Sequence, residues 1–546
     1  MKRILITAAL IYANGPPHLG HIRSTYLPAD IYARYCRLAG NEVLYICATD
    51  EHGTPIVISA ENEKKKLKEF VDFYYKKDKS EFEQLGFSFD IFHRTSSVEN
   101  KKMTEYIFVR LKENGHIYQK EIEQPYCEKC LRFLPDRFVI GTCPYCKSEK
   151  QYSDYCEVCG RVLKTSEIVE PKCIVCKNNP VMKKSTHYFF KLSSFSHKLK
   201  DYISKNPNFQ TEIVNYVLNW INSGLIDWDI SRDMDWGVKI PGESSKVFYV
   251  WFDAPIGYMS STMAATKQWE KFWKTQSKIV HFIGKDISYH HYLFWPAMLM
   301  GANENFLLPN AIPVRGYLNL EHRKFSKSKG WFVSLGDFLA EFPPDYLRYY
   351  ETAITPNSVE DANFIWKEFG ARINNELVSN LGNFVHRTLV LIKKICNSEI
   401  PKPKLCNDDK KILAKITETV EKTAALLDKF EFRDAQDEIM RTTSEFNKYL
   451  SEREPWKDKN TERVATTLYV SSRWVSALTT LLNPFLPFTS QKLANMIGIK
   501  IQNWKDADKE HLKPGAKIGE VEILFKKIDD KQIERMEQML KKRVSE

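Results

Sequence analysis

Apolar and polar positions near the start of the chain predict a strand, a turn and a helix. Residues 4–10 form a short apolar run typical of a buried parallel strand, and residues 22–38 have helical periodicity, with Pro28 expected to kink the helix. The turn between them carries His18 and His21. A strand, a Gly/Pro turn and a helix open a nucleotide-binding βαβ unit, because helix N-termini favour phosphate. Two histidines at this spacing can also simply cap or line a packed helix.

Three further apolar segments predict strands, at residues 42–48, 246–251 and 279–283, and polar and aromatic residues follow each of them. Ligands of doubly wound sheets bind beyond the carboxyl ends of the strands, so these residues should form one pocket. Core packing is the commoner role of Trp and Tyr. Asp50 follows the first of these segments, where it can meet a cationic group or cap the next helix, and position alone leaves both open.

Helical patterns occupy most of the remaining chain. Residues 56–115 are Lys/Glu-rich and helix-periodic, and their apolar positions predict helices laid on the sheet: Phe70, Phe73, Tyr74 and Phe82. Beyond residue 345, apolar residues step by three and four, which predicts an all-α bundle. The first of these stripes comprises Ile373, Leu377, Leu381, Phe384, Thr388, Leu391 and Ile395.

Eight of the twelve cysteines fall in four C-x-x-C pairs, a spacing typical of metal ligands more than of disulfides. Eight thiolates make two tetrahedral zinc sites, which would be structural because they leave no open position for substrate. The short spacer in the middle favours a nested pairing, with Cys143, Cys146, Cys156 and Cys159 on one ion and Cys127, Cys130, Cys173 and Cys176 on the other. Sequential pairing of neighbouring motifs remains open, and iron–sulfur ligation is a minor alternative.

Composition places the chain among ordinary globular proteins of several domains. Its 546 residues are 43% hydrophobic and 27% charged. The net charge of +11 suits a polyanionic partner such as RNA, although charge alone is weak evidence. No segment has the ~20 apolar residues of a transmembrane helix, so we expect no membrane association and a cytoplasmic location.

Residues 324–330, Lys-Phe-Ser-Lys-Ser-Lys-Gly, form a basic, hydroxyl-rich loop suited to phosphate, although alone it would be interpreted as a solvated surface loop. Paired with the His-Leu-Gly-His of residues 18–21, it resembles the two signatures of class I aminoacyl-tRNA synthetases. Further motifs are Ala-Leu-x-Tyr-Ala-Asn-Gly from residue 9, Asp-Ala-Pro-Ile-Gly-Tyr at 253–258, and Glu-Pro-Trp at 454–456. With the cysteine pairs in a short insert, they make nearly the whole chain similar to the methionyl-tRNA synthetase family.

The resemblance implies an α/β fold: a doubly wound parallel (Rossmann-type) catalytic domain with a zinc-knuckle insert, followed by an all-α helical bundle. The catalytic domain would occupy residues 1–115 and 236–315, interrupted by the insert at 116–235. A lysine-loop junction domain would follow at 316–365, and an anticodon-binding bundle at 366–546. No carboxy-terminal dimerising domain is recognised, so a monomer is expected.

The resemblance also implies an activity and its residues. Methionine and ATP would give methionyl-adenylate and pyrophosphate, and the methionyl group would then pass to the terminal adenosine of methionine tRNA, with Mg²⁺ accompanying ATP and one or two structural zinc ions. Charge stabilisation would come from His18, His21, Lys324 and Lys327. ATP would lie near Tyr12, Asn14, Gly15, Gly20, Gly284, Lys285, Asp286, Ser326 and Ser328. Methionine would contact Leu10, Tyr12, Asp50, Trp251, Ala254, Pro255, Tyr258, Ile287 and His291.

For the tRNA anticodon, the resemblance implies Asn380, Pro455 and Trp456, with an indole stacked on an unpaired base. Without the resemblance, a Trp after Pro at a helix junction would be assigned to the core. Three positions depart from the family pattern: Phe325 replaces a Met of the lysine loop, His290 replaces a Phe beside the amino acid, and Phe384 replaces an arginine toward the anticodon. Arg387, one turn along, is the candidate replacement for that arginine.

Two rival hypotheses stay in view. One is a related enzyme for leucine, isoleucine, valine or cysteine, but the insert leaves little room for an editing domain, and closed four-thiolate sites do not suit a catalytic zinc. The other is a non-enzymatic zinc-ribbon RNA-binding protein, which the intact histidines and loop lysines argue against.

Overall fold

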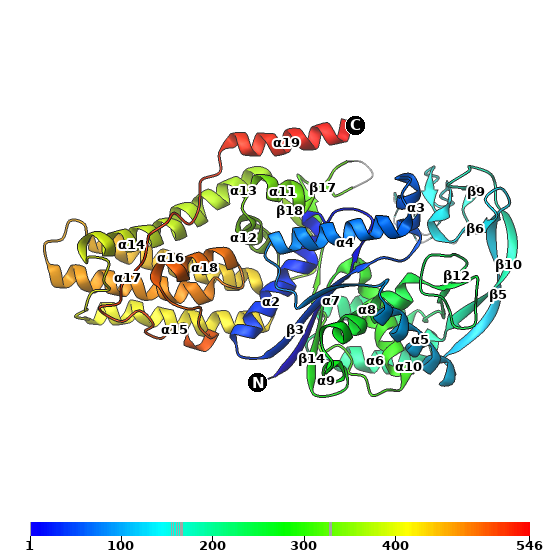
Figure 1. Cartoon of the computed structure of the whole chain (residues 1–546), viewed down its shortest axis with the longest axis horizontal. Coiled ribbons are helices and arrows are strands. Elements are labelled where there is room, and N and C mark those ends of the chain that lie inside the picture. Colours follow the sequence, from blue (N-terminus) through cyan, green and yellow to red (C-terminus); the bar gives the residue numbers. More distant parts are fainter. Residues whose placement is uncertain are drawn as a thin grey trace.

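The computed structural model describes residues 2–153, 156, 158–159, 161, 163, 167–326 and 330–545. The molecule is elongated, with a parallel sheet in the middle, an antiparallel insert at one end and a helical bundle at the other (Figure 1). None of the described helices combines the length and apolar character needed to span a bilayer.

The central sheet is parallel and has six strands. Strand β1 (Arg3–Ala8) lies between β14 (Ser277–Gly284) and β3 (Glu42–Asp50), and β15 (Val314–Arg315) extends the β14 edge. Beside β3 lie β2 (Ile11–Tyr12) and β4 (Ile91–Arg94). The strands predicted at residues 4–10, 42–48 and 279–283 are confirmed. Their near-continuous burial is what a sheet covered by helices on both faces requires.

A long helical segment follows β1 and covers the sheet. It consists of α1 (Leu19–His21), a π-helical turn (Ile22–Tyr26) and α2 (Leu27–Leu38), so the helix predicted at residues 22–38 is confirmed. Pro28 lies in the first turn of α2, directly after the π turn. The missing N–H of proline therefore falls where the regular α-helical ladder is already interrupted.

Three helices follow β3: α3 (Thr54–Asn62), α4 (Leu67–Gln84) and α5 (Val98–Glu113). Phe70, Tyr74 and Phe82 are buried on α4 as predicted, but Phe73 is half exposed. The expectation for Phe73 was wrong because the buried face of α4 runs through Val71, Tyr74, Asp78 and Phe82, and Phe73 lies outside that face although it is only three residues from Phe70.

The strand predicted at residues 246–251 is wrong over most of its length. Only β13 (Val247–Phe248) is extended, paired antiparallel with β12 (Ser231–Arg232), and α8 (Val250–Ala265) begins at once. Tertiary context thus overrides the β-propensity of a Val/Phe/Tyr/Trp run. After β14 come a 3₁₀ turn (Lys285–Ile287), a π turn (His290–Phe294) and α10 (Trp295–Ala302).

The insert is built on a long antiparallel pair, β5 (Ile117–Cys127) with β10 (Val181–Phe190), which carries the cysteine-rich segment at its far end (Figure 1). That segment contains β6 (Arg132–Phe133), β7 (Val139–Thr142), β8 (Gln151–Tyr152) and β9 (Val169–Cys173). Helices α6 (Ser196–Lys205) and α7 (Thr211–Asn222) and strand β11 (Trp228–Asp229) lead back toward the sheet.

The junction after the sheet holds β16 (Leu318–Leu320), β17 (Arg323–Lys324), α11 (Leu335–Glu341), α12 (Pro344–Ile354) and β18 (Ala362–Phe364). The predicted bundle is confirmed as α13 (Trp366–Arg372), a π segment (Ile373–Gly382), α14 (Asn383–Ile395), α15 (Asn407–Asp428), α16 (Phe432–Arg453), α17 (Thr461–Leu481) and α18 (Pro487–Ile497). A last helix, α19 (Asp530–Ser545), returns to the junction (Figure 1).

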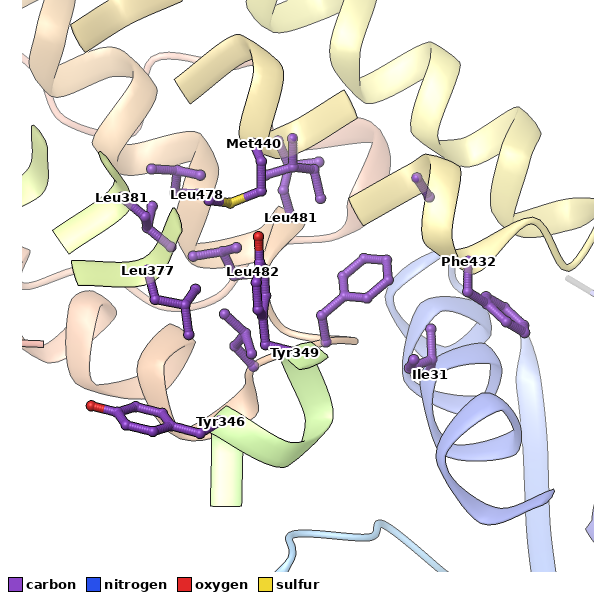
Figure 2. Close-up of a cluster of buried hydrophobic side chains, with 14 of the residues drawn as sticks. Ile31, Tyr346, Tyr349, Leu377, Leu381, Phe432, Met440, Leu478, Leu481 and Leu482 are labelled. Carbon is purple, nitrogen blue, oxygen red and sulfur yellow. The ribbon is translucent and has the colours of Figure 1, made fainter. Parts of the chain in front are cut away.

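One hydrophobic core joins the bundle to the region that contains the parallel sheet. Figure 2 shows Tyr346 and Tyr349 of α12 among leucines of the bundle, with Ile31 of α2 close to Phe432 of α16. A fully buried ion pair crosses the same boundary, with 2.7 Å between Arg348 of α12 and Asp30 of α2. The helical bundle and the parallel-sheet region are therefore packed together across α12.

Candidate functional site

His18 and His21 form one stacked pair at the start of the first helix. Their ring centroids are 3.6 Å apart, and the backbone N–H of His18 donates to Nδ1 of His21 over 3.3 Å. Gly20 makes room for this arrangement, since a Cβ built there would lie 3.1 Å from the His18 ring. The pair follows directly on β1 and β2, at the carboxyl edge where nucleotides bind in such sheets.

The described ends of the lysine loop lie against this turn, about 300 residues away in sequence. His18 forms a β-bridge with Ser334, and the His18 and Phe325 rings stack with 5.0 Å between centroids. Ser326 and Trp331 exchange two backbone hydrogen bonds of 2.9 Å at the base of the loop. Phe325, the departure from the family's Met, thus has a packing role. Lys327 and Ser328 lie outside the described residues, and Lys324 is exposed on β17.

Tyr12 and Asp50 face each other across two parallel strands, because β2 pairs with the last two residues of β3. Asp50 is buried, and the N-cap of α3 is Gly53, so the helix-cap alternative for Asp50 does not hold. Burial raises the pKa of Asp50 well above its usual range, and the neighbouring Asp253 carboxylate raises it further. A bound cation would relieve both effects.

Helix α8 presents four of the predicted residues at positions i, i+3, i+4 and i+7, which share one helix face: Trp251, Ala254, Pro255 and Tyr258. Leu10 packs on the same helix, with its Cδ1 only 2.8 Å from where a Cβ of Gly257 would lie. The surface is apolar and aromatic, as an unbranched thioether prefers.

His291 closes this surface as a neutral ring. Its Nδ1 lies 3.0 Å from the carbonyl oxygen of Ile287, which only accepts, so Nδ1 carries the proton. Its Nε2 therefore accepts from the hydroxyl of Tyr258 over 2.8 Å. Burial lowers the pKa of His291 to about 4, which keeps the ring uncharged at neutral pH.

His290 stacks on Trp251, with 3.7 Å between ring centroids and 13° between planes. Both of its ring nitrogens are buried, and they have no hydrogen-bond partner among the described residues. Burial lowers the pKa of His290 well below its usual value. The substitution of the family's Phe therefore keeps an aromatic wall and adds two polar atoms without adding charge.

The strand end at residues 284–286 borders the helical segment that follows the His18 turn. A Cβ on Gly284 would lie 2.7 Å from a carboxylate oxygen of Asp286 and 4.0 Å from the hydroxyl of Ser24. Lys285 is engaged elsewhere: its ammonium is 2.5 Å from Asp361 and lies over the Tyr317 ring. An ATP contact by Lys285 would thus compete with this ion pair.

A cavity of about 330 Å³ opens beside Tyr12, Asn14 and Trp251 and is also lined by residues that the sequence did not single out as site residues, namely Arg137, Arg232, Trp236 and Tyr249. The Arg232 guanidinium lies 3.9 Å from the centre of the Tyr249 ring, and the Trp236 indole donates to the carbonyl of Glu51 over 2.6 Å. The sequence could have pointed to Arg232 and Trp236, because they belong to a polar and aromatic segment between the insert and α8. No sequence feature marked Arg137 as a site residue.

A second missed group is the buried pair of His52 and Asp253, whose Nδ1 and Oδ2 are 2.7 Å apart. Asn100 also donates to Asp253, over 3.4 Å. These partners occupy Asp253 and leave Asp50 as the carboxylate next to Tyr12. The signal for Asp253 was its place in the Asp-Ala-Pro-Ile-Gly-Tyr motif.

The eight paired cysteines gather into two clusters, each with its sulfurs within 4.8 Å of one another: Cys127, Cys130, Cys173 and Cys176, and Cys143, Cys146, Cys156 and Cys159. This is the nested grouping, and the sequential alternative is not formed. Four sulfurs converging at this spacing fit a tetrahedral zinc ion.

At the far end of the molecule, the half-buried Asn380 and Arg387 and the exposed Trp456 lie on one surface of the bundle. Trp456 is 42% exposed, which excludes a core role, and the Arg387 guanidinium lies 4.7 Å from the centre of its ring. Pro455 beneath it is buried. Asn380 and Arg387 both bond to α16, Asn380 to Ser444 over 2.9 Å and Arg387 to Ser451 over 3.2 Å. Phe384 is fully buried between them.

Comparisons with known proteins agree with this geometry. Two family models match: tRNA synthetases class I (M) over residues 4–389, and the anticodon binding domain of methionyl tRNA ligase over residues 400–543. The methionine–tRNA ligase of Methanopyrus kandleri is 43% identical over 556 residues, spanning 99% of this chain and 82% of the relative. That of Methanocaldococcus jannaschii is 44% identical, spanning 98% and 81%.

A solved structure is similar over nearly the whole chain. The crystal structure of Mycobacterium tuberculosis methionyl-tRNA synthetase bound by methionyl-adenylate has a TM-score of 0.81 at 27% identity and covers 96% of this chain and 100% of that one. The free-state structure of the same enzyme gives a TM-score of 0.74.

Proposed function

The chain belongs to the methionyl-tRNA synthetase family and catalyses the ATP-dependent joining of methionine to its tRNA, and from this premise we propose which of its residues carry each step. The observation that supports the assignment most directly is the facing of Tyr12 and Asp50 beside the apolar face of α8.

Methionine would bind with its ammonium group on Asp50, the buried carboxylate with a raised pKa. Its side chain would lie against the apolar and aromatic surface formed by Leu10, Tyr12, Trp251, Ala254, Pro255, Tyr258, Ile287 and His291. The neutral His291 ring suits an uncharged thioether. The amino-acid carboxylate is then directed toward the His18 turn.

ATP would occupy the carboxyl edge of the sheet between the His18 turn and the lysine loop. A methionine carboxylate oxygen attacks the α-phosphorus, the bond from that phosphorus to the β-phosphate oxygen breaks, and pyrophosphate leaves. His18, His21, Lys324 and Lys327 would stabilise the charge that grows on the phosphates. The remaining contacts with ATP would come from Tyr12, Asn14, Gly15, Gly20, Gly284, Lys285, Asp286, Ser326 and Ser328, and Mg²⁺ would accompany the nucleotide.

In the second step, the 2′-hydroxyl of the terminal adenosine attacks the carbonyl of the adenylate, and AMP leaves. We propose that Asn380, Arg387, Pro455 and Trp456 hold the anticodon, supported by the exposure of the Trp456 ring. Both cysteine clusters would hold structural zinc. The domain boundaries, the monomeric state and the cytoplasmic location expected from the sequence stay predictions.

The test is ATP–pyrophosphate exchange without tRNA. Methionine alone among the standard amino acids should support it, and exchange with isoleucine or leucine would contradict the assignment. Asp50→Asn should raise KM for methionine about 100-fold, the usual scale for a lost buried charge pair. Lys327→Ala should instead lower kcat by orders of magnitude with little change in KM for methionine. An equal loss of methionine binding in Lys327→Ala would mean that this lysine is scaffold.

A further inference from the structure

Helix α19 returns from the bundle to the junction and lies against the arm of the lysine loop that leads back into the fold (Figure 1). Its side chains Met536 and Leu540 are buried. Ile533, also on α19, lies 3.5 Å from where a Cβ of Gly370 on α13 would be. The helix is therefore docked on this face along its length.

Arg543, in the last turn of α19, makes three kinds of contact with that arm. It donates to the carbonyl oxygen of Phe332 over 3.0 Å, pairs with Asp337 at 3.0 Å, and lies 4.7 Å from the centre of the Phe332 ring. A planar guanidinium can make all of these contacts at once, whereas the point charge of a lysine cannot.

The backbone of α19 also touches the loop. Gly330 has φ +66°, and a Cβ built on it would lie 2.3 Å from the carbonyl oxygen of Arg543. Any larger residue would meet the backbone of α19, so the approach depends on glycine.

The opposite side of the same arm is tied to the His18 turn. Besides the β-bridge of His18 with Ser334, the N–H of Leu335 donates to the carbonyl of Pro17 over 2.8 Å. Ser334 and Asp337 form the capping box of α11, so the carboxylate that receives Arg543 also fixes the residue that pairs with His18. Burial alone would raise the pKa of Asp337, but hydrogen bonds from Arg543 and Ser334 hold it below its usual value.

We propose that Arg543 is a positioning residue for amino-acid activation: it fixes residues 330–337 against the His18 turn, and through them the base of the lysine loop. This rests on the function proposed above for that loop. Arg543 makes these contacts about 200 residues away in sequence from the arm it holds, and it acts on the phosphate side of the site, away from the methionine surface on α8.

The test compares Arg543→Ala with Arg535→Ala. Arg535 lies on the same helix and pairs with Glu341 at the other end of α11, so its loss weakens the docking of α19 without touching the loop arm. Arg543→Ala should lower kcat of methionine-dependent exchange about tenfold with KM for methionine unchanged within twofold, since a displacement of about 1 Å can cost as much as about 100-fold and the arm keeps its contacts with the His18 turn. Arg535→Ala should keep the wild-type kcat.

A double-mutant cycle with Asp337→Asn tests whether Arg543 acts on kcat through Asp337. If Arg543 acts through Asp337, the double variant should be no slower than Asp337→Asn alone. Three results would each overturn the proposal. One is a double variant whose loss of kcat is the product of the two single losses. The others are an unchanged kcat in Arg543→Ala and an equal loss of kcat in Arg535→Ala. Wild-type protein that shows no methionine-dependent exchange would instead contradict the proposed function itself.

Discussion

The imidazole of His290 lies flat on the indole of Trp251, with 3.7 Å between ring centroids, in the wall of the proposed methionine surface. This stack brings a histidine into a place where burial lowers its pKa well below the usual value, and where His291 lowers it further. Its two ring nitrogens are buried, and the described residues offer them no hydrogen bond. The wall is thus aromatic but less stable than an all-carbon ring would make it.

His290→Phe should therefore stabilise the fold. Removing two unpartnered buried nitrogens should raise the free energy of unfolding by about 1 kcal/mol at pH 7. The gain should grow as pH falls below about 6.5, because the unfolded chain binds a proton on His290 that the folded chain does not. Well below that pH the extra difference approaches about 1.4 kcal/mol per pH unit. Urea unfolding at pH 7.0 and 5.5 measures it.

The control is His386→Phe. His386 is exposed on α14, so replacing it removes no buried polar atom, and this variant should not raise the free energy of unfolding. A His290→Phe gain that is the same at both pH values would contradict the assignment of a buried neutral ring.

Gly20→Ala should slow adenylate formation. The new methyl group would lie 3.1 Å from the His18 ring, so the stacked histidine pair must shift. We expect kcat of exchange to fall about tenfold, with KM for methionine little changed. Gly370→Ala is the matched control, because its methyl group would meet nothing closer than 3.5 Å. That variant should be fully active, and no loss in Gly20→Ala would mean that the His18 ring position is unimportant.

The metal clusters should each bind one zinc ion, and pairs of substitutions test the grouping. Cys127→Ser with Cys173→Ser falls within one cluster and should remove one zinc ion per chain, whereas Cys127→Ser with Cys143→Ser should remove both. Sequential pairing predicts the reverse. Native mass spectrometry counts the ions, and Cys396→Ser, outside both clusters, should lose none.

Trp456→Ala should impair tRNA charging and leave activation intact. Its ring is half exposed at the end of the bundle, and a lost base–aromatic stack is worth about 1–3 kcal/mol, or roughly 5- to 150-fold in kcat/KM for tRNA. Exchange without tRNA should not change. Lys457→Ala, which removes the neighbouring exposed charge, should have a much smaller effect; equal losses in both variants would mean that charge alone attracts the tRNA.

Regular apolar patterns predicted most of the fold. Strands β1, β3 and β14 and the bundle helices followed from runs and stripes whose burial repeats over many residues. The pattern failed at residues 246–251, where β-prone residues enter α8, because pairing with β12 lasts only two residues. It also drifted in the bundle: Ile395 is 46% exposed, while Leu389 and Ile392 are buried. The predicted positions in the π segment Ile373–Gly382 and at the start of α14 are buried, so the drift begins only after Thr388.

The candidate site was predictable where motifs mark it and hidden where only folding brings residues together. His18, Asp50 and Tyr258 stand in recognisable sequences. Arg137 reaches the cavity from inside the cysteine-rich insert, and Arg543 reaches the loop arm from the last helix. Neither has a local signal, because their roles arise from long-range packing.

The facing of Tyr12 and Asp50 depends on strand register, and register is counted in residues. Successive side chains along β3 point to opposite faces. Deleting one residue between 42 and 49 while the start of β3 kept its pairing would therefore move Asp50 into the position of Thr49, opposite Ile11, and turn the carboxylate away from the pocket. Substitutions along β3 can be compensated by neighbouring side chains, but a change in its length cannot. We expect the spacing between the glutamate that begins this strand and the aspartate that ends it to tolerate no insertion or deletion.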